Sequence, residues 1–141
     1  MKDEIKIIVD SSGSMGEIGV SSVVKYILNI LKNNFEISNI KYDIILINNE
    51  TKEIENIKEI KFFNQLKESI LIDYILKNRE FKIIFLTDGD FYIDEQIYLE
   101  EENDLYCLYF GEKIKFSLEK LTTSDKIFHC SEITNLIKKI I

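Results

Sequence analysis

The chain has 141 residues, of which 45% are apolar and 30% charged, and its formal net charge is −7. This composition is typical of one globular domain, expected over residues 1–141, rather than of a disordered chain. The negative charge argues against nonspecific binding to nucleic acid or to an anionic membrane, because the long-range field has the wrong sign. No apolar run reaches the roughly 18 residues of a membrane span, and the start of the chain lacks the apolar region of a signal peptide. We therefore expect a cytoplasmic protein, and the abundance of Ile, Lys and Asn suggests a bacterial or phage source with an AT-rich genome.

Short runs rich in isoleucine predict strands that are buried on both faces, as in a parallel sheet. These runs cover residues 5–9, 44–47, 83–86, 105–110 and 127–130. Residues 42–60 predict a hairpin whose second strand is an antiparallel edge, because the cluster Asn48-Asn49-Glu50 is a turn signal.

Longer segments between these runs carry apolar residues at helical spacing. The three stripes are Val20, Val24, Ile27, Leu28 and Leu31; Phe63, Leu66, Ile70, Tyr74 and Ile75; and Ile133, Leu136, Ile137, Ile140 and Ile141. Ser131 is the expected N-cap of the last helix. The alternation of strands and helices predicts an open, doubly wound, Rossmann-like α/β sheet that is mostly parallel, with one antiparallel edge strand and helices on both faces. Ligands of such sheets bind at the carboxyl ends of the strands.

Polar side chains follow two of the predicted strands. Asp10 ends the first strand, and the hydroxyls of Ser12 and Ser14 follow it, while Asp88 comes soon after the strand at residues 83–86. Two carboxylates brought together repel each other, and a divalent cation removes that penalty. All of these donors are oxygens, so Mg²⁺ or Mn²⁺ suits them better than zinc. Each segment is also a common turn or cap sequence, but their joint occurrence at strand ends favours a metal site.

The same segments resemble a known family. Residues 7–15, IIVDSSGSM, resemble the DxSxS motif that opens the metal-ion-dependent adhesion site (MIDAS) of von Willebrand factor A (vWA) domains. Residues 83–89, IIFLTDG, resemble the later strand that carries the second aspartate of that site, and the chain from residue 105 onward looks like the end of a vWA domain. The resemblance covers essentially the whole chain and implies a small, stand-alone member of prokaryotic type.

The resemblance also implies roles for individual residues. Ser12 and Ser14 would ligate the metal through their hydroxyls, and Asp10 and Asp88 would hold it mainly through bound waters. A vacant coordination position would take an acidic side chain from a partner. The family's further hydroxyl, from a Thr in a Gly-Thr segment after the third strand, has no counterpart in residues 59–66. Asn64 is the nearest oxygen donor there, and an N-cap is its more common role.

A non-catalytic protein–protein interaction module, or adaptor, is the function that the resemblance implies. Its partner would supply an Asp or Glu, and intracellular relatives work in multiprotein systems, often with AAA+ ATPases. One alternative is a haloacid-dehalogenase-like phosphohydrolase, with Asp10 as nucleophile and Gly89 to Asp94 matching a GDxxxD motif. That family's phosphatases need a second acid where this chain has Ser12. The other alternative is a vWA-like scaffold that binds no metal, which the missing Thr favours.

The remaining metal-binding residue types are sparse. His129 and Cys130 are adjacent, but a zinc site needs further ligands, so we expect them to pack. Cys107 and Cys130 are far apart in the sequence and form no CxxC motif. We therefore expect two free, buried thiols.

Overall fold

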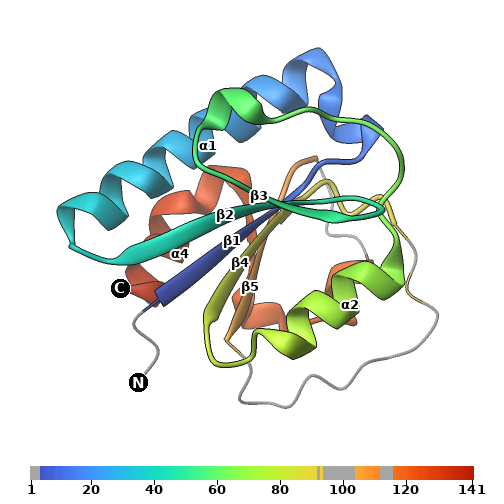
Figure 1. Cartoon of the computed structure of the whole chain (residues 1–141). Helices are drawn as coiled ribbons and strands as arrows, with labels where there is room; N and C mark the ends of the chain where they lie inside the picture. The colour runs from blue at the N-terminus through green and yellow to red at the C-terminus, as the bar shows by residue number, and fades with distance from the viewer. Residues whose placement is uncertain (1–3, 92, 94–103, 112–115) are drawn as a thin grey trace.

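A computed structural model describes residues 4–91, 93, 104–111 and 116–141. Within these residues six strands form one sheet in the order β3-β2-β1-β4-β5-β6 (Figure 1). The strands are β1 (Glu4–Asp10), β2 (Lys41–Ile47), β3 (Thr51–Ile54), β4 (Lys82–Thr87), β5 (Leu105–Tyr109) and β6 (Ile127–His129). All neighbours pair in parallel except β2 and β3, which pair antiparallel at one edge. The predicted mostly parallel sheet and its antiparallel edge hairpin are confirmed.

Four α-helices of the described residues cover the two faces of the sheet (Figure 1). They are α1 (Ile18–Ile37), α2 (Glu68–Lys77), α3 (Phe116–Glu119) and α4 (Ile133–Ile140). Helices α1 and α4 pack on one face, and α2 and α3 pack on the other. Short 3₁₀ turns lie between these elements, at η1 (Gly13–Gly16), η2 (Ile57–Glu59), η3 (Ser124–Lys126) and η4 (Cys130–Glu132). Helices on both faces match the doubly wound arrangement expected from the sequence.

The core forms two layers because side chains alternate between the faces of a strand. In β1, Ile7 and Val9 pack with α1 and α4, whereas Ile8 packs with α2 and α3. All three are fully buried, and burying one such side chain contributes roughly 1.5–3 kcal/mol. Coverage of both faces explains why the central strands read as continuous apolar runs.

Helix beginnings differ from the sequence predictions. Helix α2 begins at Glu68 with Lys67 as its N-cap, so the predicted N-cap role of Asn64 is wrong. Residues 61–67 instead form an irregular segment, here called the strap, that is bonded to the residues following β1 and β2. Ser131 does not cap α4 either, because it lies inside η4, where the His129 side chain accepts a hydrogen bond from the Ser131 N–H. In both places a tertiary contact or a 3₁₀ turn replaces the expected helix start.

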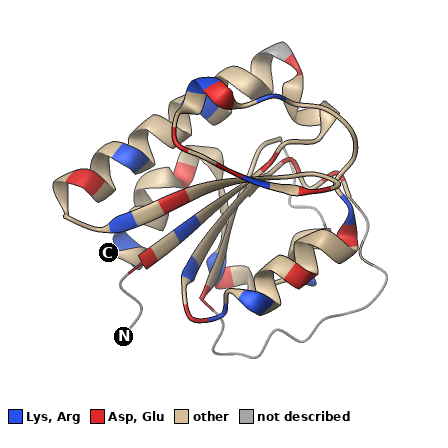
Figure 2. Ribbon diagram, viewed as in Figure 1, with Lys and Arg blue, Asp and Glu red and all other residues tan. Residues whose placement is uncertain are grey.

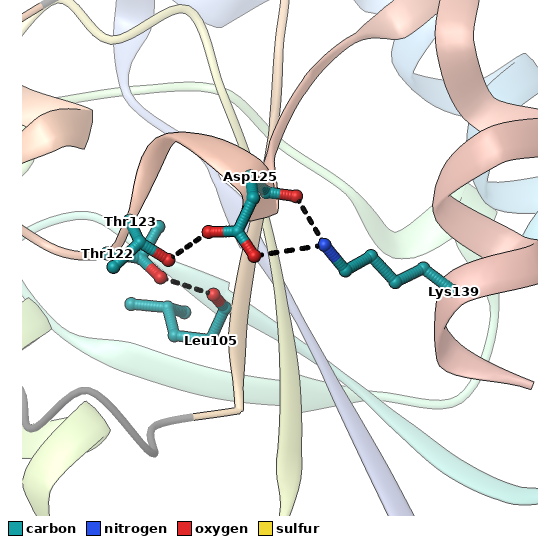
Figure 3. Close-up of polar contacts among 5 residues, drawn as sticks. All are labelled: Leu105, Thr122, Thr123, Asp125 and Lys139. Carbon is teal, nitrogen blue, oxygen red and sulfur yellow. Dashed lines mark hydrogen bonds and ion pairs between the residues drawn. The ribbon is translucent and has the colours of Figure 1, made fainter.

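Polar contacts fix the C-terminal part of the chain against the sheet (Figure 3). Lys139 Nζ donates to the carboxylate of Asp125 at 3.1 Å and to its backbone carbonyl at 2.8 Å. The hydroxyl of Thr123 also donates to Asp125, and these two partners lower the pKa of that carboxyl. Beside them, the Thr122 hydroxyl donates to the carbonyl of Leu105 at 2.8 Å. Lys139 therefore ties α4 to the turn that precedes β6, and Thr122 is bonded to the first residue of β5.

Basic and acidic residues are interspersed along α1, α2 and the strands (Figure 2). No helix within the described residues combines the length and the apolar character needed to cross a membrane. Some sequence predictions concern other residues. Asp94 of the GDxxxD motif, and residues 113–115 of the vWA-like C-terminal part, lie outside the described residues.

Candidate metal site

Asp10 ends β1 in the middle of the sheet and is fully buried. Its Oδ1 accepts a hydrogen bond from the Ser12 N–H at 3.0 Å, and its Oδ2 accepts one from the Thr87 hydroxyl at 2.6 Å. The first bond is an Asx turn, which lets the chain reverse directly after the strand. Each carboxylate oxygen thus has a partner in the protein.

Ser12 and Ser14 lie on the loop that leaves β1 and enters η1. Their hydroxyl oxygens are 3.3 Å apart. Adjacent ligands of an octahedral Mg²⁺ ion, each 2.0–2.1 Å from the metal, lie about 3 Å apart. The two hydroxyls are therefore close to the spacing at which both could ligate one ion. Met15 holds this loop in place, because its side chain is fully buried in the core beneath α1.

The pKa of the Asp10 carboxyl is raised above its usual value of 3.8, mainly because burial disfavours the charged form. Hydrogen bonds from Ser12 and Thr87 lower the pKa, and the charge of Asp88 raises it again. Burial therefore outweighs the local hydrogen bonds. A cation beside Asp10 would offset this penalty, since an opposite charge favours the ionised form.

Asp88 directly follows β4, so it lies with Asp10 at the carboxyl ends of the two neighbouring parallel strands β1 and β4. Its side chain is partly exposed, and its Oδ1 accepts a hydrogen bond from the Asp90 N–H at 2.9 Å. Between them, Gly89 adopts a φ of 75°, a left-handed conformation that favours glycine. The structure therefore brings Asp10, Ser12, Ser14 and Asp88 to the carboxyl ends of β1 and β4. Asp90 acts there through its backbone N–H.

Asn64 lies on the strap, and the strap packs on residues 11–16, the loop that carries Ser12 and Ser14 and is called the serine loop below. The backbone carbonyl of Asn64 accepts from the Gly13 N–H at 2.9 Å, and the Phe63 N–H donates to the carbonyl of Ser11 at 2.9 Å. The side chain of Asn64 donates to Asn49 Oδ1 at 3.2 Å. The structure thus places the backbone of Asn64 against the loop, while its amide nitrogen is bonded to the β2–β3 turn. A role of Asn64 in place of the missing Thr stays a prediction.

Two buried polar residues at this edge were missed in the sequence. Thr87, the last residue of β4, donates to Asp10 and accepts from the Gly89 N–H at 3.0 Å. Asn48 follows β2 and holds the strap through two hydrogen bonds. Its side-chain amide donates to the Phe63 carbonyl at 3.2 Å, and its backbone carbonyl accepts from the Lys67 N–H at 2.9 Å. Thr87 could have been found from its place, because it ends a buried strand beside the strand of Asp10.

The donor set suits a hard cation. Among the described residues, no group of three or more His, Cys, Asp or Glu side chains comes together to hold a metal. The candidate site relies instead on two hydroxyls and two carboxylates, and oxygen ligands of this kind fit Mg²⁺ or Mn²⁺. Such an ion would neutralise the buried Asp10 carboxylate, and the paired hydroxyls beside it would be its ligands. These residues therefore fit a Mg²⁺ or Mn²⁺ ion.

His129 and Cys130 lie at the carboxyl end of β6, the border strand on the other side of the sheet from β3. The two ring nitrogens of His129 contact the Ser131 hydroxyl at 2.7 Å and the Gly111 carbonyl at 2.8 Å. The ring also packs edge-on against Tyr109. Cys107 and Cys130 are both free thiols, as expected, but only Cys107 is buried, so the predicted burial of Cys130 is wrong. These contacts agree with a packing role for His129.

Comparisons with known proteins place the fold. No protein-family model and no curated protein matches the chain. Among solved structures, proximal thread matrix protein 1 from the mussel byssus gives a TM-score of 0.70 at 14% identity, covering 100% of this chain and 47% of that one. A structure of the same protein with a zinc-occupied MIDAS motif gives 0.72 at 12% identity, covering 99% and 46%.

A third similar structure is the ArnB paralog VWA2 from Sulfolobus acidocaldarius, with a TM-score of 0.58 at 18% identity, covering 97% of this chain and 45% of that one. The chain thus spans about half the length of these solved chains. At such identities the likeness concerns the fold alone. The chain has the fold of vWA domains, a Rossmann-like α/β sheet with one antiparallel edge strand.

Proposed function

We propose that the chain is a non-catalytic protein–protein interaction module that binds an acidic side chain of a partner through a Mg²⁺ or Mn²⁺ ion. The ion would be held at the carboxyl ends of β1 and β4. The observation that carries this proposal is the pair of hydroxyls of Ser12 and Ser14, 3.3 Å apart and directly after the buried Asp10. A zinc-occupied MIDAS in a protein of the same fold supports it.

The residues of the site divide into two kinds. Ser12 and Ser14 would be direct ligands, because their hydroxyls are paired and Ser14 is partly exposed. Asp10 would act through bound water rather than as a direct ligand, since each of its oxygens already accepts one hydrogen bond from the protein. Asp88 would complete the site from the next strand. The bound ion would supply positive charge and an open coordination position for a carboxylate.

A protein partner with an exposed Asp or Glu is the ligand that this site suits. The chain has a net charge of −7, so an acidic partner approaches against the overall field. A cation at the contact offsets that repulsion locally and makes the interaction depend on the metal. A component of a multiprotein system, such as an AAA+ ATPase, is the partner class that we propose.

The buried position of Asp10 disfavours the phosphohydrolase alternative. A nucleophilic carboxylate must reach the phosphorus atom of its substrate. Asp10 has no exposed surface, and its two oxygens are bonded to Ser12 and Thr87. Position 12 also carries a hydroxyl where that family's phosphatases need an acid. We therefore propose no enzymatic activity for the chain.

Metal binding is tested by calorimetric titration of the metal-free protein with Mn²⁺. We expect one site in the wild type and loss of binding in the double variant Ser12→Ala/Ser14→Ala. Ser69→Ala is the matched control, because Ser69 is an exposed hydroxyl on α2. Negligible binding by the wild type would favour the metal-free scaffold and overturn the proposal.

The interaction itself is tested by affinity capture with this protein as bait, in Mg²⁺ and in EDTA. We expect a defined set of partners that is lost both in EDTA and with the Ser12→Ala/Ser14→Ala bait. Partners that stay the same would show that the site is not the contact surface. In parallel, Mg²⁺-dependent hydrolysis of p-nitrophenyl phosphate that disappears in Asp10→Ala would establish the enzyme instead.

A further inference from the structure

Thr87 joins the two halves of the candidate site through one hydroxyl group. This side chain is fully buried. Its Oγ1 accepts a hydrogen bond from the Gly89 N–H at 3.0 Å and contacts Asp10 Oδ2 at 2.6 Å. A threonine hydroxyl has a single proton, and the Gly89 N–H can only donate, so that proton points to Asp10. The distance of 2.6 Å between Thr87 Oγ1 and Asp10 Oδ2 is typical of a hydroxyl that donates to a carboxylate.

Ser117 holds the same glycine from the opposite side. Its hydroxyl, on α3, donates to the Gly89 carbonyl at 2.9 Å, and the side chain is buried. Gly89 has a φ of 75°, which few other residues adopt without strain. The peptide groups on both sides of Gly89 are thus fixed, one to β4 and one to α3. Asp88 immediately precedes this clamped glycine, so its backbone has little freedom.

We propose that Thr87 is a positioning residue of the metal site, which sets the turn carrying Asp88 against the Asp10 carboxylate. The inference rests on the proposed function and deepens it. The chain of hydrogen bonds runs from Asp10 through Thr87 and Gly89 to Ser117. Thr87 itself would not ligate the ion, because its hydroxyl is bonded to Asp10 and to the Gly89 N–H. It fixes the orientation of one carboxylate and the place of the other, as residues behind metal ligands commonly do.

Substitutions at Thr87 separate positioning from packing. Thr87→Val keeps the shape of the side chain but leaves Asp10 Oδ2 and the Gly89 N–H without their partner. Thr87→Ser keeps the hydroxyl and removes a methyl group from a buried place. A role in packing alone would make Thr87→Ser the more harmful change for the site, whereas positioning makes Thr87→Val the more harmful one.

The experiment is a titration of the metal-free full chain with Mn²⁺, followed by calorimetry, with circular dichroism to confirm folding. We expect Thr87→Val to weaken Mn²⁺ binding by about 10- to 100-fold, the usual effect of losing a residue behind a metal ligand. Thr87→Ser should stay within about threefold of the wild type. The control is Thr122→Val, a buried threonine bonded to Leu105, which should leave Mn²⁺ affinity unchanged.

Ser117→Ala keeps the proposal testable if Thr87→Val fails to fold. It removes the clamp on Gly89 at a distance from Asp10, and we expect weaker Mn²⁺ binding with the fold retained. Wild-type affinity in Thr87→Val, or in Ser117→Ala where Thr87→Val does not fold, would overturn the positioning role while the proposed function stands. Absence of Mn²⁺ binding in the wild type would overturn both.

Discussion

Gly16 allows the strap to pack on the serine loop. A Cβ atom built at Gly16 would lie 2.8 Å from the Cβ of Phe62, closer than carbon atoms approach each other. Phe62 cannot move away easily, because its ring packs on the core beneath α1 and the next residue, Phe63, is bonded to Ser11. We therefore expect Gly16→Ala to push the strap away from the loop or to distort the loop itself.

The expected loss follows from two opposing terms. Forcing an extra methyl group into a packed place costs about 1–3 kcal/mol. Replacing Gly by Ala at a position without a special φ returns about 0.4–1 kcal/mol, because the unfolded chain loses freedom. Taking the middle of each range, the net loss for Gly16→Ala is about 1 kcal/mol. For a chain of this length that corresponds to a fall in Tm of roughly 3–5 °C.

Urea unfolding and thermal unfolding measure the change, and Gly19→Ala is the matched control. A Cβ at Gly19 meets nothing within 4 Å, and the residue lies in the first turn of α1. Alanine favours a helix over glycine by about 0.5–1 kcal/mol, so Gly19→Ala should stabilise the protein. A Gly16→Ala protein as stable as the wild type would refute the close approach of strap and loop.

Three further predictions follow from buried side chains. Met15→Ala should lower the free energy of unfolding by about 2–5 kcal/mol, since Met15 is fully buried in the core beneath α1, and a loss below about 1 kcal/mol in urea unfolding would contradict this. The raised pKa of Asp10 favours its protonated form in the folded state, so its contribution to stability is complete below the unfolded value of 3.8 and is lost as pH rises through the folded pKa. In EDTA, the stability of the wild type relative to Asp10→Asn should therefore fall from acid to neutral pH, and a constant difference would count against a raised pKa. Cys107 is fully buried and burial raises the pKa of its thiol, whereas Cys130 is partly exposed, so a thiol reagent should label Cys130 first and Cys107 only on unfolding.

Local patterns in the sequence predict the sheet and most of the helices. Apolar runs that are covered on both faces are distinctive, so β1, β2, β4, β5 and β6 fall where the runs are. The antiparallel edge strand β3 also follows from its turn signal and its shortness. These features depend on neighbouring residues, which is why they are visible in the chain alone.

Contacts between distant residues explain what the sequence does not reveal. The apolar spacing from Phe63 predicts a helix, but Phe63 is bonded to Ser11 and to Asn48, and α2 begins only at Glu68. The pattern also gives no sign that Thr87 donates to a carboxylate 77 positions earlier. Strand ends could be predicted as the place of the candidate site, whereas the hydrogen bonds that orient its side chains needed the structure.

The most direct test of metal binding between Ser12 and Ser14 is a crystal structure of the protein grown with Mn²⁺, with data collected for anomalous scattering. We expect an anomalous peak within about 2.3 Å of both serine hydroxyl oxygens, at the edge of the sheet between β1 and β4. A peak at other residues only, or none at these hydroxyls while the protein is folded, would contradict the metal site at Asp10, Ser12, Ser14 and Asp88.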